Sequence, residues 1–190
     1  MTRSFRNVAT RSWMIAGALA LCMQMSAQAA QPHFTLAMPD AEDNAFFSPD
    51  NAAMANGCGG KNVSPALYWS NPPPGTQSFA LVMHDPDGQK GLGVDHWLRY
   101  GLPFSLAEIA TGVGGESKLE GMGGVNTRGT TDYMGPCPPP GDSPHHFVIQ
   151  LYALDLAHDA LKPGLTGDEF RAAIKGHILG VSSVVRRYQR

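Results

Sequence analysis

Apolar residues recur along the chain in short runs that are separated by residues typical of turns. Five runs have the length and the β-branched or aromatic content of strands: residues 34–38, 66–69, 79–84, 96–102 and 147–154. The stretch around residues 78–83 is apolar at nearly every position, which is typical of a strand buried on both faces. Gly and Pro gather between the runs, so the pattern predicts strands joined by tight, stiff connections.

One helix is signalled near the C-terminus. The sequence Thr-Gly-Asp-Glu at residues 166–169 fits a capping box, and the apolar Phe170 and Ile174 after it share a helix face. Residues 178–188 return to a β-branched composition and predict a last strand, while residues 105–110 predict a second short helix. The chain is therefore expected to be mostly β, with one or two peripheral helices.

Composition narrows the class of protein. The 190 residues suit one domain, and 22 Gly with 15 Pro among only 16% charged residues disfavour a coiled coil or a disordered tail. The formal net charge is −2, and no basic patch is visible. Because nucleic-acid binders present a basic face, we expect no nucleic-acid partner.

The first 29 residues have the pattern of a secretory signal peptide. A basic start precedes an apolar run at residues 13–23, and Ala27-Gln28-Ala29 is a small-x-small cleavage site. We therefore expect cleavage after Ala29, a single mature domain of residues 30–190 without a transmembrane segment, and a periplasmic or secreted location. A lipid anchor at Cys22 and an uncleaved membrane anchor remain as alternatives.

Removing this segment changes the charge and the cysteine count. Three arginines leave with it, so 11 basic and 16 acidic residues remain, a net charge of −5. The two remaining cysteines, Cys58 and Cys137, are expected to form a disulfide in an oxidising compartment. It would close a loop of about 80 residues, for which chain entropy predicts about 4 kcal/mol of stabilisation. Two buried free thiols are the alternative, and a catalytic cysteine is a weaker one.

Familiar catalytic signatures are missing, such as a Gly-x-Ser-x-Gly elbow, a Gly-rich dinucleotide turn or a His-Glu-x-x-His helix. Polar residues instead gather at three predicted strand ends: His-Asp-Pro-Asp-Gly at residues 84–88, Asp-His-Trp at 95–97, and His-His-Phe at 145–147, which follows the loop Gly-Pro-Cys-Pro-Pro-Pro-Gly at 135–141. Strand ends that lie side by side form a concave, partly rigid site.

The groups available there favour binding of an anion. Imidazoles can donate to an anionic oxygen, and the backbone of Gly135 can approach a ligand because it has no side chain. Asp85 cannot attract an anion directly, but it can orient His96 or His145 and raise its pKa, or bind the ammonium end of a zwitterion. Successive strand residues face opposite sides, so His84 should face away from Asp85, and only one of His145 and His146 should line the site.

These motifs resemble the phosphatidylethanolamine-binding protein family, in particular its bacterial, Raf-kinase-inhibitor-like branch. The similarity also includes Gly-Cys-Gly-Gly-Lys-Asn-Val-Ser-Pro-Ala-Leu at residues 57–67, Tyr-Met-Gly-Pro-Cys-Pro-Pro at 133–139 and Leu-Tyr-Ala-Leu-Asp at 151–155. It runs in order over roughly residues 33–188. The resemblance implies a central β-sheet flanked by a smaller sheet, with one to three peripheral helices.

The resemblance also implies a small pocket for phosphate, acetate or a phosphoethanolamine head group, without a cofactor or a metal. By position, the ligand-binding residues are Asp85, Asp87, His96, Gly135, Pro136, His145 and the aromatic position Phe147. Asp87 is expected to cap the turn before Gly88 rather than to contact the ligand.

Two positions depart from the family pattern. The family commonly has an aromatic hydroxyl where this chain has Phe147, so one donor to the anion is lost, a contact worth about 1.5–3 kcal/mol. It often has a tryptophan where this chain has Val94 and Asp95, and Asp95 adds negative charge. We therefore expect a modified preference for anions, with a less charged ligand as one outcome.

Two function classes follow from these residues. The first is a non-catalytic exported protein that binds a small anion or a phospholipid head group. The second is an exported inhibitor or effector that contacts another protein, with the pocket regulatory or vestigial. A metal site built from the histidines and aspartates, or a hydrolase using His96 and Asp85 as an acid–base pair, fits less well. The sequence shows neither metal-ligand spacing nor a nucleophile.

Overall fold

The computed structural model describes Met1, residues 32–115 and residues 119–190. The predicted signal peptide and Cys22 therefore lie outside the described residues, apart from Met1. Among the described residues, no helix has the length and the apolar character needed to cross a membrane.

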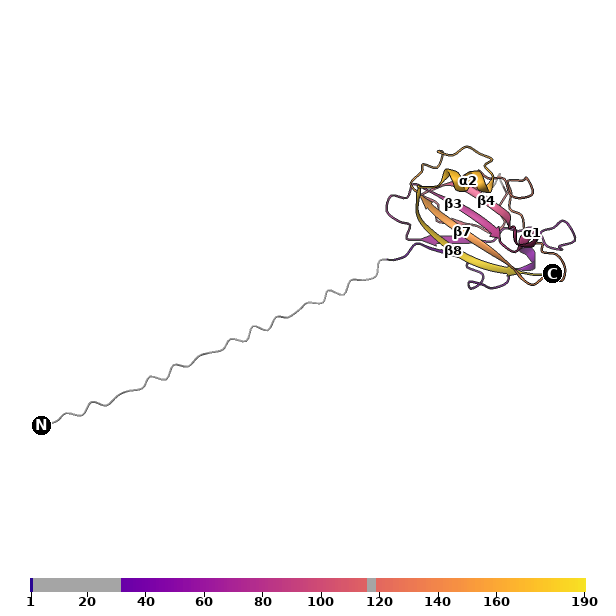
Figure 1. The fold of residues 1–190 in the computed structure, drawn as a ribbon, viewed down its shortest axis with the longest axis horizontal. Coiled ribbons are helices and arrows are strands. Elements are labelled where there is room, and N and C mark those ends of the chain that lie inside the picture. Colours follow the sequence, from indigo (N-terminus) through magenta and orange to yellow (C-terminus); the bar gives the residue numbers. More distant parts are fainter. Residues whose placement is uncertain (2–31, 116–118) are drawn as a thin grey trace. The chain divides into compact units, whose positions relative to one another are not determined.

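Two antiparallel β-sheets form the fold of residues 32–190 (Figure 1). The central sheet has five strands in the order β6 (Met122–Gly123), β4 (Val94–Pro103), β3 (Ser78–Asp85), β7 (His145–Leu154) and β8 (Ile178–Tyr188). The smaller sheet has three strands in the order β1 (Thr35–Ala37), β2 (Leu67–Ser70) and β5 (Glu108–Ile109). The helical elements are short: η1 (Pro49–Asn51), α1 (Gly88–Gly91) and α2 (Gly167–Ala173). The predicted mostly β fold with a smaller flanking sheet is confirmed.

The middle strand, β3, is buried on both faces, as its apolar sequence predicts. Phe79, Leu81 and Met83 belong to the core that the two sheets share. Ala80 and Val82 belong to a second core, under α2, together with Phe170. Because strand side chains alternate between faces, one apolar run supplies both cores. This places the end of β3, where the candidate site begins, inside the molecule.

The predicted strands and the predicted C-terminal helix are all present, with one short element wrong. The capping box of α2 is formed, since the Glu169 carboxylate accepts from Thr166 N at 2.9 Å and Thr166 Oγ1 accepts from Glu169 N at 3.4 Å. The helix predicted at residues 105–110 is absent, because Glu108–Ile109 forms β5 instead. Ile109 pairs with Leu67 of β2 and is buried between the sheets, so tertiary burial decides the conformation of this short segment.

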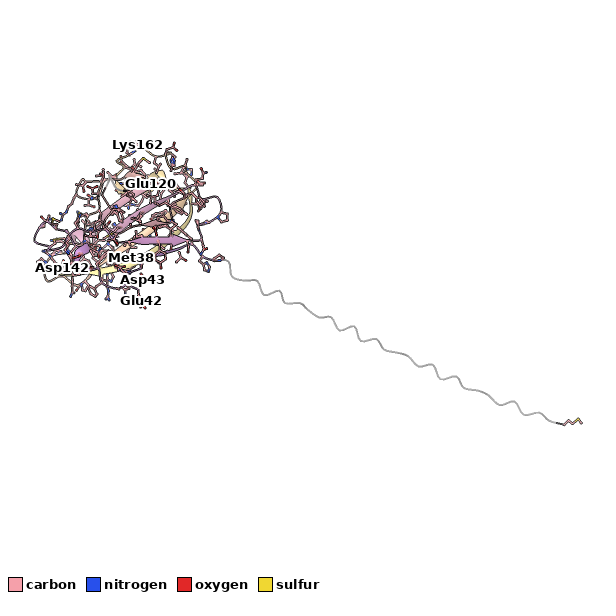
Figure 2. The ribbon with its side chains drawn as sticks, turned by 180° about the vertical axis from the view of Figure 1, so that it is seen from behind. Met38, Glu42, Asp43, Glu120, Asp142 and Lys162 are labelled. Carbon is pink, nitrogen blue, oxygen red and sulfur yellow. A yellow bond between two sulfur atoms is a disulfide. The ribbon has the colours of Figure 1, made fainter. Side chains whose placement is uncertain are left out.

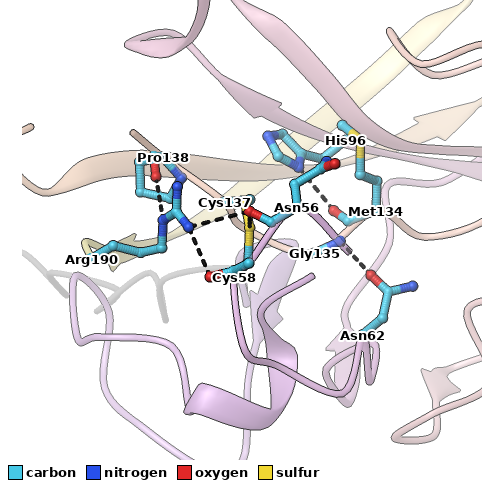
Figure 3. Close-up of a disulfide and its surroundings, with 10 residues drawn as sticks. Asn56, Cys58, Asn62, His96, Met134, Gly135, Cys137, Pro138 and Arg190 are labelled. Carbon is cyan, nitrogen blue, oxygen red and sulfur yellow. Dashed lines mark hydrogen bonds between the residues drawn. A yellow bond between two sulfur atoms is a disulfide. The ribbon is translucent and has the colours of Figure 1, made fainter. Parts of the chain in front are cut away.

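The predicted disulfide is present. Cys58 and Cys137 are bonded, with their Cα atoms 5.6 Å apart and 79 positions apart in sequence. Arg190 supports the same junction, because its Nη1 donates to Gly57 O at 2.9 Å and its Nε to Pro138 O at 2.8 Å (Figure 3). The disulfide and this arginine thus join the loop after η1, the loop before β7 and the C-terminus.

Reduction of the disulfide is expected to lower the free energy of unfolding by about 4 kcal/mol, because the unfolded chain regains the freedom of an ~80-residue loop. Denaturant unfolding with and without a reductant measures this change, and intact mass checks that the oxidised protein is two hydrogens lighter. A Cys58→Ala/Cys137→Ala double variant serves as the control, since the reductant should not alter its unfolding midpoint. An unchanged midpoint for the unaltered protein would contradict the prediction.

Candidate functional site

The candidate site is a cavity of about 250 Å³ at one end of the central sheet. Antiparallel pairing brings the end of β3 beside the starts of β4 and β7. The loop before β7 closes the remaining side. The cavity is lined by Asp85, Gly88, Gln89, Val94, His96, Thr127, Arg128, Met134, Gly135, Cys137, Pro138, Pro139 and His145. The structure therefore brings together Asp85, His96, Gly135 and His145 among the residues predicted from sequence.

Asp85 is the buried centre of this site, with only 4% of its surface exposed. Its Oδ1 accepts from the backbone N–H groups of Asp87 and Gly88 at 2.9 and 3.0 Å. Its Oδ2 lies 2.8 Å from His145 Nδ1 and 3.9 Å from His96 Nε2. Burial alone would raise the pKa of Asp85, but the contacts with His96 and His145 outweigh it and hold the pKa below its usual value.

His145 is oriented by that carboxylate. Its Nδ1–H donates to Asp85 Oδ2, and its Nε2 lies 3.5 Å from the half-exposed carboxylate of Asp142. Burial would lower the pKa of His145, yet the bond to Asp85, with the help of Asp142, raises it above its usual value. The ring therefore takes up a proton readily, and its Nε2–H can then serve as a donor.

His96 is oriented by the backbone instead. Its Nδ1 lies 2.8 Å from the carbonyl oxygen of Met134 (Figure 3). A carbonyl only accepts, so Nδ1 carries the proton in this bond and Nε2 is left on the side of Asp85. The rings of His96 and Phe147 also pack edge to face, with 5.1 Å between their centres. On protonation Nε2 becomes a second donor beside His145.

Packing explains why residue 135 in the cavity wall is a glycine. Its N–H donates to Asn62 Oδ1 at 2.8 Å (Figure 3), and Asn62 Nδ2 donates to Tyr133 O at 3.0 Å. A Cβ at position 135 would collide with the backbone of Asn51 and would lie 2.5 Å from Ala53 N. Glycine thus lets the two loops approach closely, while its N–H is already engaged within the protein.

Three predicted ligand-binding residues, Asp87, Pro136 and Phe147, do not line the cavity. Phe147 is completely buried between His96 and Phe47. Pro136 is buried, and its carbonyl accepts from Ala53 N.

The expectation that Asp87 caps the turn before Gly88 is wrong. The Asp87 carboxylate instead accepts from the backbone N–H and the ring Nδ1 of His146, at 2.8 and 3.0 Å. Asp85 caps the turn instead. It lies at the buried end of β3, and its Oδ1 accepts from the backbone N–H groups of Asp87 and Gly88.

Asp95, which departs from the family pattern, lies outside the cavity wall. Its carboxylate accepts from His84 Nδ1 at 2.7 Å and from Arg171 of α2 at 3.0 Å. Burial would raise the pKa of Asp95, but these two partners lower it. Its charge is therefore balanced by neighbours on the other face of the sheet. The predicted alternation is confirmed, since His84 faces away from Asp85 and His146 is exposed while His145 is buried.

Sequence reasoning missed Arg128, an exposed cation in the cavity wall. It lies in a turn between β6 and the loop before β7, far from the three motifs in sequence. The only signal was a single arginine within Asn-Thr-Arg-Gly at residues 126–129. Within residues 32–115 and 119–190, no three histidine, cysteine or acidic side chains converge as a metal site requires.

Known proteins with a similar sequence come from diverse microorganisms. A UPF0098 protein of Aquifex aeolicus is 33% identical over 134 residues, which are 70% of this chain and 78% of that protein. The putative lipoprotein LppC of Mycobacterium tuberculosis is 36% identical over 163 residues, 86% of this chain and 75% of that protein. The UPF0098 protein YbcL of Escherichia coli is 33% identical over 132 residues, 67% of this chain and 69% of that protein.

Solved structures with the same fold agree with these matches. The crystal structure of E. coli YbcL, described as a member of the mammalian PEBP family, superposes with a TM-score of 0.77 and 27% identity over 83% of this chain and 98% of that chain. A putative phosphatidylethanolamine-binding protein homologue from Chlamydia trachomatis superposes with a TM-score of 0.72 and 25% identity, over 83% and 97% of the two chains. The family model described as phosphatidylethanolamine-binding protein matches residues 37–189. The chain belongs to the phosphatidylethanolamine-binding protein family.

Proposed function

We propose that this protein is an exported, non-catalytic binding protein that holds a small anionic group, such as phosphate or the phosphorylated head group of a phospholipid. The observation that carries the proposal is the pair His96 and His145 around Asp85 in one small cavity. Each ring has its Nδ1 fixed by an acceptor, so protonation leaves Nε2–H as the donor that an anionic oxygen can use.

Asp85 acts in this proposal as a positioning residue. Both of its oxygens already accept hydrogen bonds from the protein, so it offers little to the ammonium end of a zwitterion. It favours the protonated form of His145, which attracts an anion. The nearby carboxylate of Asp142 opposes anion binding, and an anion at Nε2 of His145 would replace that contact.

The cavity wall supports binding rather than a reaction. Its candidate nucleophiles are Cys137 and Thr127. Cys137 is held in a disulfide, and the Thr127 hydroxyl accepts from Asp95 N at 2.8 Å. An acid–base pair of His96 and Asp85 finds no free thiol to activate in this wall.

The signal-peptide pattern of residues 1–29 supports export, and the disulfide is compatible with it, because disulfides persist in oxidising compartments. The relative LppC bears the name of a putative lipoprotein, which is compatible with export. We propose that cleavage after Ala29 releases a mature protein that works in the periplasm or outside the cell.

Replacement of His145 by alanine is expected to weaken binding of inorganic phosphate about 10- to 100-fold, because one charge-assisted hydrogen bond is lost. Asp85→Asn is expected to weaken it too, since the imidazole then loses its charged partner. Calorimetric titration of the purified, oxidised protein measures both effects. His146→Ala is the matched control, because this neighbouring ring is exposed and faces away from the cavity. Equal losses in the two histidine variants, or no saturable binding at millimolar phosphate, would refute the proposal.

Anion affinity is expected to fall as pH rises. The pKa of His145 is raised, so the ring is protonated below that pKa and loses its charge as pH rises through it. An anion binds the protonated ring more tightly, and the affinity should therefore decrease as the pH rises above 6.5, the usual pKa of a histidine. Sulfate is the suitable probe, since its own charge does not change in this range. A tighter complex at the higher pH, or an identical slope in His145→Ala, would be inconsistent with this role of His145.

A further inference from the structure

We propose that Arg128 sets the charge selectivity of the cavity: its guanidinium binds the second negative charge of a phosphate-type dianion and favours it over a carboxylate. This inference rests on the proposed anion site and adds a residue outside the motifs that define that site. It assigns the ligand to the class of dianionic oxyanions, which includes inorganic phosphate and phosphate monoesters.

The backbone of Arg128 is fixed although its side chain is exposed. Asn126 is buried, and its Oδ1 accepts from Arg128 N at 3.0 Å and from Thr130 N at 3.2 Å. Its Nδ2 donates to Asp132 O at 3.0 Å. The buried side-chain amide of Asn126 therefore fixes the conformation of this turn. The backbone of Arg128 is in place before a ligand binds.

The guanidinium of Arg128 is held by Asn56. With its amide oxygen turned toward Arg128, Asn56 accepts from Nη1 at 2.7 Å and from Nη2 at 2.9 Å. Asn56 lies two residues before Cys58, in the loop that the disulfide joins to the cavity wall (Figure 3). A guanidinium has five N–H groups, so three remain after these two bonds, and they can bind an oxyanion.

The charges around the cavity explain why this arginine matters. His96 and His145 are cationic only when protonated, whereas Arg128 is cationic at every relevant pH. Asp85 and Asp142 place negative charge beside the histidines. Phe147 supplies no hydroxyl donor and is buried behind the wall. A permanent cation in the wall offsets the repulsion from the two carboxylates and the missing hydroxyl donor. Its attraction is strongest for a ligand with two negative charges.

The test compares sulfate, a dianion, with acetate, a monoanion, by calorimetry at one pH on the oxidised protein. Arg128→Gln is expected to weaken sulfate binding about ten-fold or more, with a change below about three-fold for acetate. Arg128→Lys should retain part of the sulfate affinity, because it keeps the charge but loses the planar set of donors.

Two further variants separate the role of Arg128 from general effects. Lys162→Gln removes one exposed positive charge that does not line the cavity and lies far from Asp142 (Figure 2), and it should alter neither affinity. Asn56→Gly removes the amide that holds the guanidinium without straining the backbone, because Asn56 has a φ of 59° that glycine adopts freely. It should weaken sulfate binding less than Arg128→Gln does.

The outcomes distinguish this inference from the proposed function. Sulfate binding that is lost in His145→Ala but unchanged in Arg128→Gln overturns the role of Arg128 alone. Equal weakening of sulfate and acetate in Arg128→Gln, or equal weakening of sulfate in Arg128→Gln and Lys162→Gln, also overturns it. An unaltered protein that binds neither anion overturns both the inference and the anion site on which it rests.

Discussion

The buried carboxylate of Asp85 is the contact on which the candidate site depends. An ionised carboxylate with 4% exposure is unfavourable unless hydrogen bonds compensate the lost water. Asp85 obtains them from the turn after β3 and from His145 at the start of β7, with His96 of β4 nearby. One charged group therefore fixes the turn, orients one imidazole and favours its protonated form.

The architecture makes this burial possible. β3 lies in the middle of the central sheet with a core on each face, so its last residue ends inside the molecule rather than at an edge. The far wall of the cavity comes from a distant part of the chain. It is held by the disulfide, by the pair Asn62 and Gly135 and by Arg190. The wall is thus fixed by contacts independent of a ligand, which lowers the cost of ordering a site on binding.

The sequence predicted those features that depend on local patterns. The apolar run at residues 78–83 predicted a strand buried on both faces, and the capping box predicted the start of α2. Two cysteines in a chain with a predicted signal peptide predicted the disulfide, and strand alternation separated His145 from His146. Family resemblance then brought Asp85, His96, Gly135 and His145 to one place, and the structure shows that they share a cavity.

Two kinds of feature could not be predicted: how deeply a side chain is buried, and how segments far apart in the sequence pack together. Phe147 lies two residues after His145 on the same strand face, but a pattern does not indicate where the cavity ends and the core begins. The segment of residues 105–110 is too short for helix propensity to decide its conformation, and pairing of Ile109 with Leu67 makes Glu108–Ile109 a strand. Arg128 has no motif, because the fold and the amides of Asn126 and Asn56 bring it to the cavity.

The most direct test of the account is a titration of the His145 ring followed by NMR, with and without sulfate. Binding of an anion to the protonated ring requires the pKa of His145 to rise further when sulfate is present. The exposed ring of His146, which does not line the cavity, is the control for nonspecific effects of sulfate. A pKa of His145 that stays constant or falls in saturating sulfate would contradict the claim that Asp85 holds this imidazole as a proton-dependent anion ligand.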